Sequence, residues 1–414
     1  MENFASLSLL QFTNYLLPFI TLPYLARVLG VEKFGVLAFA GAVVIYFETL
    51  TDFGFNYTAT RDIAKNKADT VYISKIFSSV MAAKTLLMCA SLIIVLILIA
   101  AMPSLKSNYA VILLTFLCIP GYIMFPEWFF QGVEKMRYIT IMNFISKLIF
   151  TLLTFMVIRE QKHYIYVPVL TFLGLFISGC ISLYVIFHRF GVKFVMPGWG
   201  DITGRLKGSY SIFFNSLFPN LYNSYSTLIL GYWGGSALVG IFDAGKKIIN
   251  FADQAMQVLS RTFFPYLSRN MHNHIIFVKI NLIAAIIFSL IFYFGAGFIV
   301  NLLFTEEFRQ AVGILKIMAI TPMLFFLISS FGTNYLILIK KDATLMKITM
   351  ISSVIGFILS NFLIYSFSLV GAALTLVLSR LLIGILVFIF ANKFRKDNSA
   401  MAGTETEGVT ALNL

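Results

Sequence analysis

The stretch FTNYLLPFITLPYLARVLG (residues 12–30) is the first of two similar segments in this chain of 414 residues. Set without gaps against FFNSLFPNLYNSYSTLILG (residues 213–231), it is identical at seven of nineteen positions. Both segments are largely apolar, both contain proline, and both end in Leu-Gly ahead of a further apolar run. Because many membrane transporters are built from duplicated halves, the similarity predicts a chain made of two related halves.

The composition places those halves in a membrane. Apolar residues make up 59% of the chain and charged residues only 12%, whereas ordinary soluble proteins carry about 25% charged residues. A helix that crosses the hydrocarbon needs roughly 20 mostly apolar residues, and only helices and closed barrels can satisfy their backbone polar groups there. Runs such as LLMCASLIIVLILIAAM (86–102) are continuous, not alternating, which favours helices over barrel strands.

The apolar runs predict twelve membrane helices. With six helices in each half, the two halves have the same orientation, so the predicted fold is an all-α polytopic membrane protein with a parallel six-plus-six repeat. We expect an N-terminal lobe (1–190), a cytoplasmic linker (191–209), a C-terminal lobe (210–391) and a disordered cytoplasmic tail (392–414). The predicted helices cover residues 4–26, 35–58, 76–102, 109–126, 139–158, 164–187, 210–232, 237–264, 276–304, 311–339, 344–367 and 370–391.

Basic residues in the loops predict the orientation of these helices. One side of the membrane receives eighteen Lys and Arg residues, and it includes both termini. Cytoplasmic loops carry the excess of basic residues, so we expect this side to be cytoplasmic. The asymmetry also accounts for the formal net charge of +13 without a nucleic-acid partner. The other side receives only six, namely Arg27, Lys33, Lys106, Arg159, Lys162 and Arg309.

Charged residues inside the predicted helices are the strongest candidates for function. A charge at the bilayer centre costs at least about 2.5–3.5 kcal/mol, so it normally faces a cavity or a partner. This argument applies most directly to Glu48, Asp52, Lys84, Lys246, Lys247 and Arg380.

Structural roles are the alternative for several of these positions. Asp243 can neutralise Lys246 or Lys247, three and four residues later on a helix. Basic side chains near helix ends can reach the membrane surface, which applies to Arg27, Arg61 and Arg261. Polar stripes of Asn and Ser residues also bond helices to one another. Pro18 and Pro23 in the first helix, and Pro219 at the repeated place in the second half, predict helix kinks.

Metal and cofactor sites are not indicated. The three cysteines lie inside apolar runs, and His272 and His274 lack neighbouring Cys or carboxylate residues, so we expect those histidines in a solvated loop. No G-x-x-x-x-G-K-[ST] loop for a nucleotide is present in the sequence. We therefore expect neither a metal nor a cofactor.

Three segments resemble the Wzx-type O-antigen flippases of the multidrug/oligosaccharidyl-lipid/polysaccharide exporter superfamily. They are NYLLPFITLPYLARVLGVEKFGVLAFA (14–40), TDFGFNYTATRDIAK (51–65) and PEWFFQGVEKMRYIT (126–140). The resemblance implies two six-helix lobes around a central cavity, lined by the first two helices of each half. It also implies a flippase in the bacterial inner membrane, with both termini cytoplasmic. By alternating access, it would move undecaprenyl-diphosphate-linked O-antigen repeat units from the cytoplasmic to the periplasmic leaflet.

That substrate sets the roles of the candidate residues. Lys and Arg suit the pyrophosphate, while amide and hydroxyl side chains suit the sugars. The candidates for the pyrophosphate and sugar cavity are Arg27, Arg61, Lys84, Asn215, Lys246, Lys247, Asn250, Arg261 and Arg380. The energy would come from an ion gradient or from downstream consumption of the product, and the candidate H⁺ or Na⁺ sites are Glu48, Asp52, Asp243 and Asp253. The partners implied are membrane lipids, with an O-antigen polymerase and a chain-length regulator as candidate protein partners.

Two other functions compete with the flippase. A multidrug exporter of the same fold would favour an acidic or aromatic cavity for cationic drugs. Apart from the basic residues assigned to the loops, seven basic and four acidic residues lie inside the predicted helices. A membrane O-antigen polymerase or ligase acts on the same lipid, but such enzymes usually need a substantial periplasmic loop, and the breaks on that side are short. The sequence therefore predicts a transporter and not an enzyme.

Overall fold

The computed structural model describes the backbone of residues 2–411 and the side chains of residues 17–395, and every regular element in these ranges is a helix. Nine helical segments of this part are long and apolar enough to cross a membrane. Three of them contain a break at which the backbone leaves helical geometry, at Gly30, Gly235 and Ser368. Since each break divides one long segment into two membrane-length helices, the described residues contain the twelve helices that the sequence predicts.

The chain folds into two compact units, which are described separately. Unit 1 comprises Met1–Asp243 and Val300–Gln310, and unit 2 comprises Ala244–Ile299 and Ala311–Leu414. The predicted lobes 1–190 and 210–391, joined by a linker at 191–209, divide the sequence at another point and stay a prediction. The predicted disordered tail, 392–414, falls mostly on residues whose side chains lie outside the described part of the chain.

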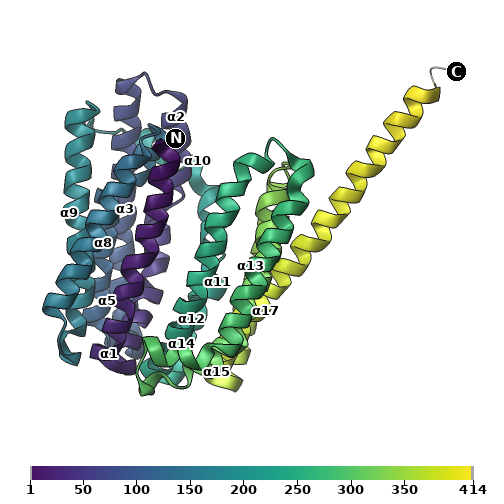
Figure 1. Cartoon of the computed structure of the whole chain (residues 1–414). Coiled ribbons are helices and arrows are strands. Elements are labelled where there is room, and N and C mark those ends of the chain that lie inside the picture. The colour runs from purple at the N-terminus through teal and green to yellow at the C-terminus, as the bar shows by residue number, and fades with distance from the viewer. Residues whose placement is uncertain (1, 412–414) are drawn as a thin grey trace. The chain divides into compact units, whose positions relative to one another are not determined.

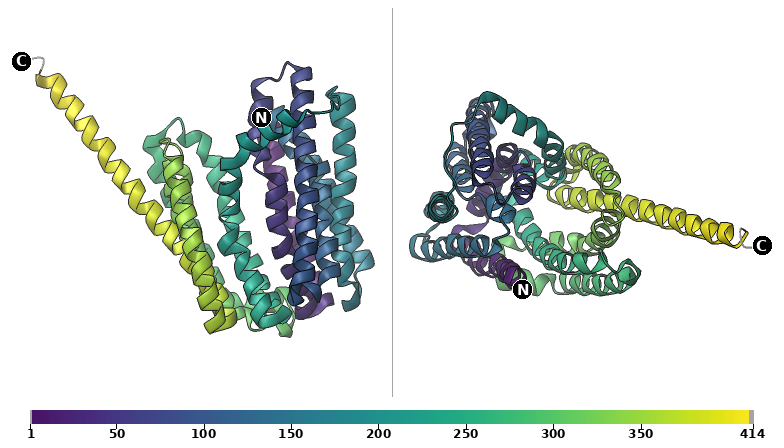
Figure 2. Two further views of the ribbon diagram at one scale, coloured as in Figure 1. Left: turned by 180° about the vertical axis from the view of Figure 1, so that it is seen from behind. Right: turned by 90° about the horizontal axis from the view of Figure 1, so that it is seen from above.

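Unit 1 is a bundle of helices of membrane length (Figures 1 and 2), in which α1, α8 and α9 pack side by side. Its helices are α1 (Glu2–Asp52), α2 (Phe55–Lys65), α3 (Thr70–Ala101), α4 (Pro103–Lys106), α5 (Tyr109–Phe116), α6 (Cys118–Met124), α7 (Glu127–Gly132), α8 (Met136–Val157), α9 (Tyr166–Arg189), α10 (Trp199–Leu217), α11 (Asn220–Asn223) and the first part of α12 (Tyr225–Leu267).

An aromatic cluster fixes α7 in unit 1. Trp128 and Phe129 are almost fully buried. The ring centroid of Phe77 on α3 lies 5.8 Å from that of Trp128 and 6.0 Å from that of Phe129. Phe190, just after α9, packs against Phe129 from another side, with ring centroids 5.4 Å apart. Because lipid is as apolar as these side chains, close packing and not exclusion from water holds such helices together. The cluster therefore sets the position of the residues at the start of α7.

Unit 2 contains the second part of α12 and the helices that follow it. These are α13 (His274–Phe294), α14 (Ala296–Leu303, whose last turn belongs to unit 1), α15 (Ala311–Met318), α16 (Thr321–Leu327), the π-helix η4 (Ile328–Leu336) and α17 (Asp342–Ala411). Met256 of α12, Ala285 of α13 and Phe326 of α16 meet in its core. A π-helix is a widened segment that is frequently found at functional sites.

The breaks at Gly30 and Gly235 have nearly the same backbone geometry. Gly30 has φ 72° and ψ 172°, and Gly235 has φ 80° and ψ 174°, a region that essentially only glycine adopts. The ungapped repeat pairs Gly30 with Gly231, so the structure places the second break four residues later than that pairing implies. Four residues are about one helical turn, so the second repeat contains one additional turn, formed by the residues YWGG (232–235). The repeat is therefore present in the backbone but requires a gap.

The helical segment after Gly30 and the helical segment after Gly235 cross each other, and a glycine of each lies at the crossing point. Gly35 lies five residues after Gly30, and Gly240 lies five residues after Gly235. A Cβ atom on Gly35 would lie 2.7 Å from the Gly240 nitrogen and would overlap the carbonyl oxygen of Ser236. A Cβ atom on Gly240 would in turn overlap the carbonyl oxygen of Val31. The repeated segments thus meet in a reciprocal backbone contact of the kind that small residues permit between membrane helices.

The prolines sit differently in the two repeats. Pro18 and Pro23 lie within α1, whose non-helical residue is Gly30. In the second half, α10 ends at Leu217 and α11 begins directly after Pro219. The helix is therefore interrupted at Pro219, whereas it continues through Pro18 and Pro23.

Candidate functional site

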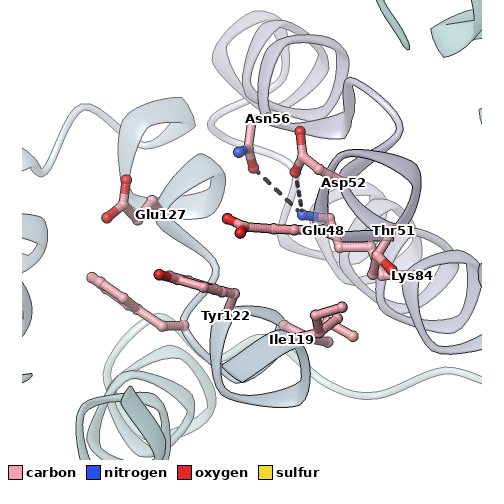
Figure 3. Close-up of a pocket in the computed structure, with 10 residues that line it drawn as sticks. Glu48, Thr51, Asp52, Asn56, Lys84, Ile119, Tyr122 and Glu127 are labelled. Carbon is pink, nitrogen blue, oxygen red and sulfur yellow. Dashed lines mark hydrogen bonds and ion pairs between the residues drawn. The ribbon is translucent and has the colours of Figure 1, made fainter. Parts of the chain in front are cut away.

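A polar cavity of about 220 Å³ lies within unit 1, between α1, α2, α3, α6 and α7 (Figure 3). All of these segments belong to the apolar spans, so its polar lining stands out from the surrounding bundle. The lining residues are Glu48, Thr51, Asp52, Asn56, Lys84, Ile119, Tyr122, Ile123, Phe125 and Glu127.

Lys84 is held at one wall of this cavity by two oxygen atoms. Its Nζ donates to Asp52 Oδ1 at 2.7 Å and to Asn56 Oδ1 at 3.5 Å, and the lysine side chain is only 7% exposed. Asp52 is the last residue of α1 and Asn56 lies in the first turn of α2. Phe53 and Gly54, which connect the two helices, both have positive φ, and this tight turn brings the two oxygen atoms to one lysine.

Glu48 and Glu127 line the same cavity, and Lys147 of α8 lies near enough to Glu127 to interact with it electrostatically. Glu48 precedes Asp52 by one helical turn and points toward the side occupied by Tyr122 and Glu127 (Figure 3). Glu127 begins α7, where its Oε1 accepts a hydrogen bond of 2.7 Å from Asn143 Nδ2. Asp52 is paired with Lys84, and Glu127 faces the charge of Lys147, so Glu48 is the carboxyl group best suited to take up a proton or a small cation, with Glu127 beside it.

A second buried ion pair lies in unit 2. Asp253 of α12 and Arg380 of α17 approach to 2.6 Å, and their side chains are 12% and 10% exposed. The sequence proposes Arg380 for the pyrophosphate and Asp253 for a coupling ion, whereas the structure bonds the two to each other. Removing one partner of such a buried pair leaves an uncompensated charge, so this pair contributes to the integrity of unit 2.

Arg27 and Arg61 lie away from the cavity. Arg27 is exposed and donates to the carbonyl oxygen of Leu302 at 2.7 Å. Arg61 is 61% exposed and lies 3.6 Å from Asp62. Neither lines the unit 1 cavity.

The remaining candidates are also outside the unit 1 cavity. Asn215, Lys247 and Arg261 are exposed. Asp243, Lys246 and Asn250 are half-buried. Their convergence on a substrate cavity stays a prediction. Among the described residues, no three His, Cys, Asp or Glu side chains converge as ligands for a metal ion.

Glu127 is the functional candidate that sequence reasoning misses. The signal was present, because Glu127 is a carboxylate inside an apolar helical segment, Tyr109–Gly132. It stands in PEWFF, one of the segments that carry the family resemblance. Tyr122 also enters the cavity only in the structure, since a single tyrosine has no distinctive pattern in the sequence, whereas Asn56 continues the four-residue spacing of Glu48 and Asp52.

A family model described as "Polysaccharide biosynthesis protein" matches residues 1–271 of the chain, including all the segments that form the unit 1 cavity. The chain belongs to the polysaccharide biosynthesis protein family. Its membership confirms the resemblance to O-antigen transporters that the sequence motifs indicate.

Two curated relatives of this chain carry the same name, "Putative O-antigen transporter". The protein from Escherichia coli (strain K12) is 28% identical over 345 residues, which cover 81% of this chain and 83% of the relative. The protein from Shigella dysenteriae is 28% identical over 268 residues, covering 65% of this chain and 67% of the relative.

Solved structures share the fold of this family member. The lipid II flippase MurJ in an inward closed conformation aligns with a TM-score of 0.76 and 14% identity, over 94% of this chain and 86% of that one. An inward-facing MATE family multidrug transporter aligns with a TM-score of 0.65 and 12% identity, over 93% and 98%. These similarities confirm the predicted polytopic exporter fold, and the relatives identify the chain as a membrane transporter and not an enzyme.

Proposed function

We propose that this protein moves a lipid-linked O-antigen repeat unit, carried on undecaprenyl diphosphate, across the bacterial inner membrane. The observation that carries the proposal is the match to relatives named as O-antigen transporters over most of the chain, together with a buried, charged cavity inside an apolar bundle. A charged interior is expensive in a membrane and normally serves a pathway or a site.

The chemistry of the substrate suits such a protein. A pyrophosphate needs cations and a sugar needs hydrogen-bond partners, whereas the polyprenyl tail can stay in the hydrocarbon. We place Lys246 and Lys247 on α12 as the pyrophosphate-binding residues, because they are adjacent cations in a membrane-length segment. Asn250 and Arg261, on the same helix, extend this proposed surface, and Asn215 of unit 1 is proposed separately as a hydrogen-bond partner for the sugar. Both termini would be cytoplasmic, and the O-antigen polymerase and chain-length regulator would act on the product.

Transport would be coupled to protons or sodium ions through the unit 1 cavity. Among the described residues that line this cavity with Glu48 and Glu127, Lys84 is the one lysine, and it pairs with Asp52, while Lys147 interacts with Glu127 from outside the lining. A carboxyl group in such a place can change its protonation as the cavity opens and closes. In this proposal Lys84 and Asp52 form the wall of the ion site, which replaces the sequence-based role of Lys84 at the pyrophosphate.

The transport step can be tested with purified protein in liposomes that contain a labelled undecaprenyl-diphosphate oligosaccharide. We expect faster exposure of the label than in protein-free vesicles, and equal rates would refute the proposal. The double variant Lys246→Ala/Lys247→Ala should slow transport at least tenfold. Lys65→Ala/Lys67→Ala removes two exposed lysines, one at the end of α2 and one in the turn after it, and should leave the rate unchanged.

Ion coupling has its own test in the same liposomes. An imposed proton or sodium gradient should accelerate the wild type, and Glu48→Gln should abolish that acceleration. Glu134→Gln, which removes an exposed carboxylate on the loop after α7, is the matched control. A gradient response that survives in Glu48→Gln and Glu127→Gln would remove the cavity from the coupling mechanism.

Multidrug export is the second candidate, and the acidic lining of the unit 1 cavity is the observation that favours it. Glu48, Asp52 and Glu127 outnumber Lys84 there, a balance that suits a cationic drug. Efflux of a cationic dye from loaded vesicles, with no movement of the lipid-linked oligosaccharide, would establish this function in place of the flippase.

A further inference from the structure

A second cavity, of about 650 Å³, lies entirely within unit 2. It forms where α13, η4 and α17 meet, and it has no part in the ion pair between Asp253 and Arg380. Its volume is within the range of about 300–1,000 Å³ that is typical of small-molecule sites. The residues that matter for its chemistry are His274, Val278, Phe331, Tyr335, Phe388 and Arg395.

The cavity lies at the ends of three membrane spans. The span Met271–Phe294 begins there, and the spans Ala311–Leu336 and Asp342–Arg395 end there. The polar ends of membrane helices lie at the level of the lipid headgroups. Its mouth is therefore placed at a membrane surface, and the basic loops around it make this the side expected to be cytoplasmic.

Polarity changes along each wall in the same direction. On α13, Val278 lies one helical turn deeper than His274, and on η4 Phe331 lies four residues deeper than Tyr335. On α17, Phe388 lies two turns deeper than Arg395. The cavity is thus cationic and polar at its mouth and apolar at depth, which is the profile of an amphiphile with an anionic head.

Hydrogen bonds fix the π-helical wall of the cavity. His274 Nε2 lies 2.8 Å from the carbonyl oxygen of Ser330, and Asn281 Nδ2 donates to Ser330 Oγ at 2.9 Å. Asn334 Nδ2 donates to Ser260 Oγ at 2.6 Å and so ties η4 to α12. The sequence predicts His274 in a solvated loop, but the structure gives it a half-buried position and a structural bond. A pocket with such an anchored wall is preformed.

The charge of the lining identifies the head of the amphiphile. Arg395 supplies one guanidinium group, and none of the described lining residues is acidic. One guanidinium with Asn392 and Tyr335 beside it can bond a single phosphate, whereas a pyrophosphate calls for more cations. We propose that this cavity binds an anionic glycerophospholipid of the surrounding bilayer, with its phosphate at Arg395 and the start of an acyl chain against Val278, Phe331 and Phe388. This inference does not depend on the proposed function.

Native mass spectrometry of the full chain in a neutral detergent can test the assignment. The detergent-purified protein is titrated with phosphatidylglycerol or with phosphatidylcholine, and the affinity of the tightest bound lipid is measured. We expect phosphatidylglycerol to bind at least tenfold more tightly. Arg395→Gln should remove this preference, and Ile275→Trp should weaken binding by filling the mouth, since Ile275 lines the cavity and is 51% exposed.

Matched controls separate the cavity from the surface as a whole. Lys393→Gln removes an exposed charge from the same helix, and Ile276→Trp adds the same bulk at a neighbouring exposed position, but neither residue lines the cavity. Both controls should bind phosphatidylglycerol as the wild type does. Equal binding of the two lipids by the wild type, or equal effects of test and control variants, would overturn the proposal. Tighter binding of undecaprenyl diphosphate, or displacement of the lipid by millimolar inorganic phosphate, would overturn the choice of a glycerophospholipid.

Discussion

The substitution Gly240→Ala tests the glycine crossing between the repeated helices. The new Cβ would overlap the carbonyl oxygen of Val31 and lie 3.2 Å from the Gly35 nitrogen. Both obstacles are backbone atoms, so no side-chain rotation can relieve the clash. The closest normal approach of a carbon atom to a carbonyl oxygen is about 3.3 Å. The two helices must therefore move apart by about 1 Å to bring the new Cβ and the Val31 oxygen to that distance. Overpacking of this kind costs roughly 1–3 kcal/mol, and we expect the upper end of that range.

Thermal unfolding of purified protein in detergent measures the effect. The matched control is Gly41→Ala, on the same helix as Gly35, where a Cβ would meet no atom within 4 Å. Alanine is the better helix former by about 1 kcal/mol, so the control should unfold at the wild-type temperature or above it. Gly240→Ala and Gly35→Ala should both unfold at lower temperature. Because the contact is reciprocal, their effects should be similar in size.

Two results would refute the reasoning. If Gly240→Ala and Gly35→Ala are as stable as Gly41→Ala, the helices do not cross in backbone contact. If only one of the two is destabilised, the contact is not the reciprocal one that the repeat implies.

Further variants probe the ion pair between Lys84 and Asp52 and the helix breaks at Gly235 and Ser368. Lys84→Gln should lower stability by about 3 kcal/mol, the lower end of the range for breaking a buried pair, because it leaves Asp52, whose side chain is 28% exposed, without its cation. Lys84→Gln/Asp52→Asn should regain much of that loss in a thermal unfolding assay while transport stays impaired, and equal stability of the single and double variants would argue against the pair. Gly235→Ala meets no atom within 4 Å, so its cost of about 1–3 kcal/mol should come from backbone strain alone, and a wild-type unfolding temperature would show that the reversal is not strained. Ser368 has φ 48°, so Ser368→Gly should raise stability by about 1 kcal/mol in the same measurement, and a loss would contradict its left-handed geometry.

The repeat is an instructive partial success of sequence reasoning. Aligned identities correctly indicate that residues 12–30 and 213–231 are related, and the two glycine breaks confirm it in the backbone. The ungapped pairing of Gly30 with Gly231 misses one extra helical turn, although the predicted gap between helices 210–232 and 237–264 does contain the break at Gly235. The only sequence signal for the crossing at Gly35 and Gly240 is that each glycine lies five residues after the glycine of its helix break. Glycines are common in membrane helices, so this spacing alone does not predict a crossing.

The sequence by itself determined the membrane class and the twelve helices, and three motifs indicated the family by resemblance. The class and the helices follow from local composition, because the bilayer sets the length of every crossing and permits almost no other spanning structure. Only the tertiary structure decided which charges pair, bonding Lys84 to Asp52 and Arg380 to Asp253. It also brought Glu127 to the same cavity as Glu48. Such pairings depend on which faces of distant helices meet, and that is set by the packing of many residues at once, so composition and spacing do not encode it.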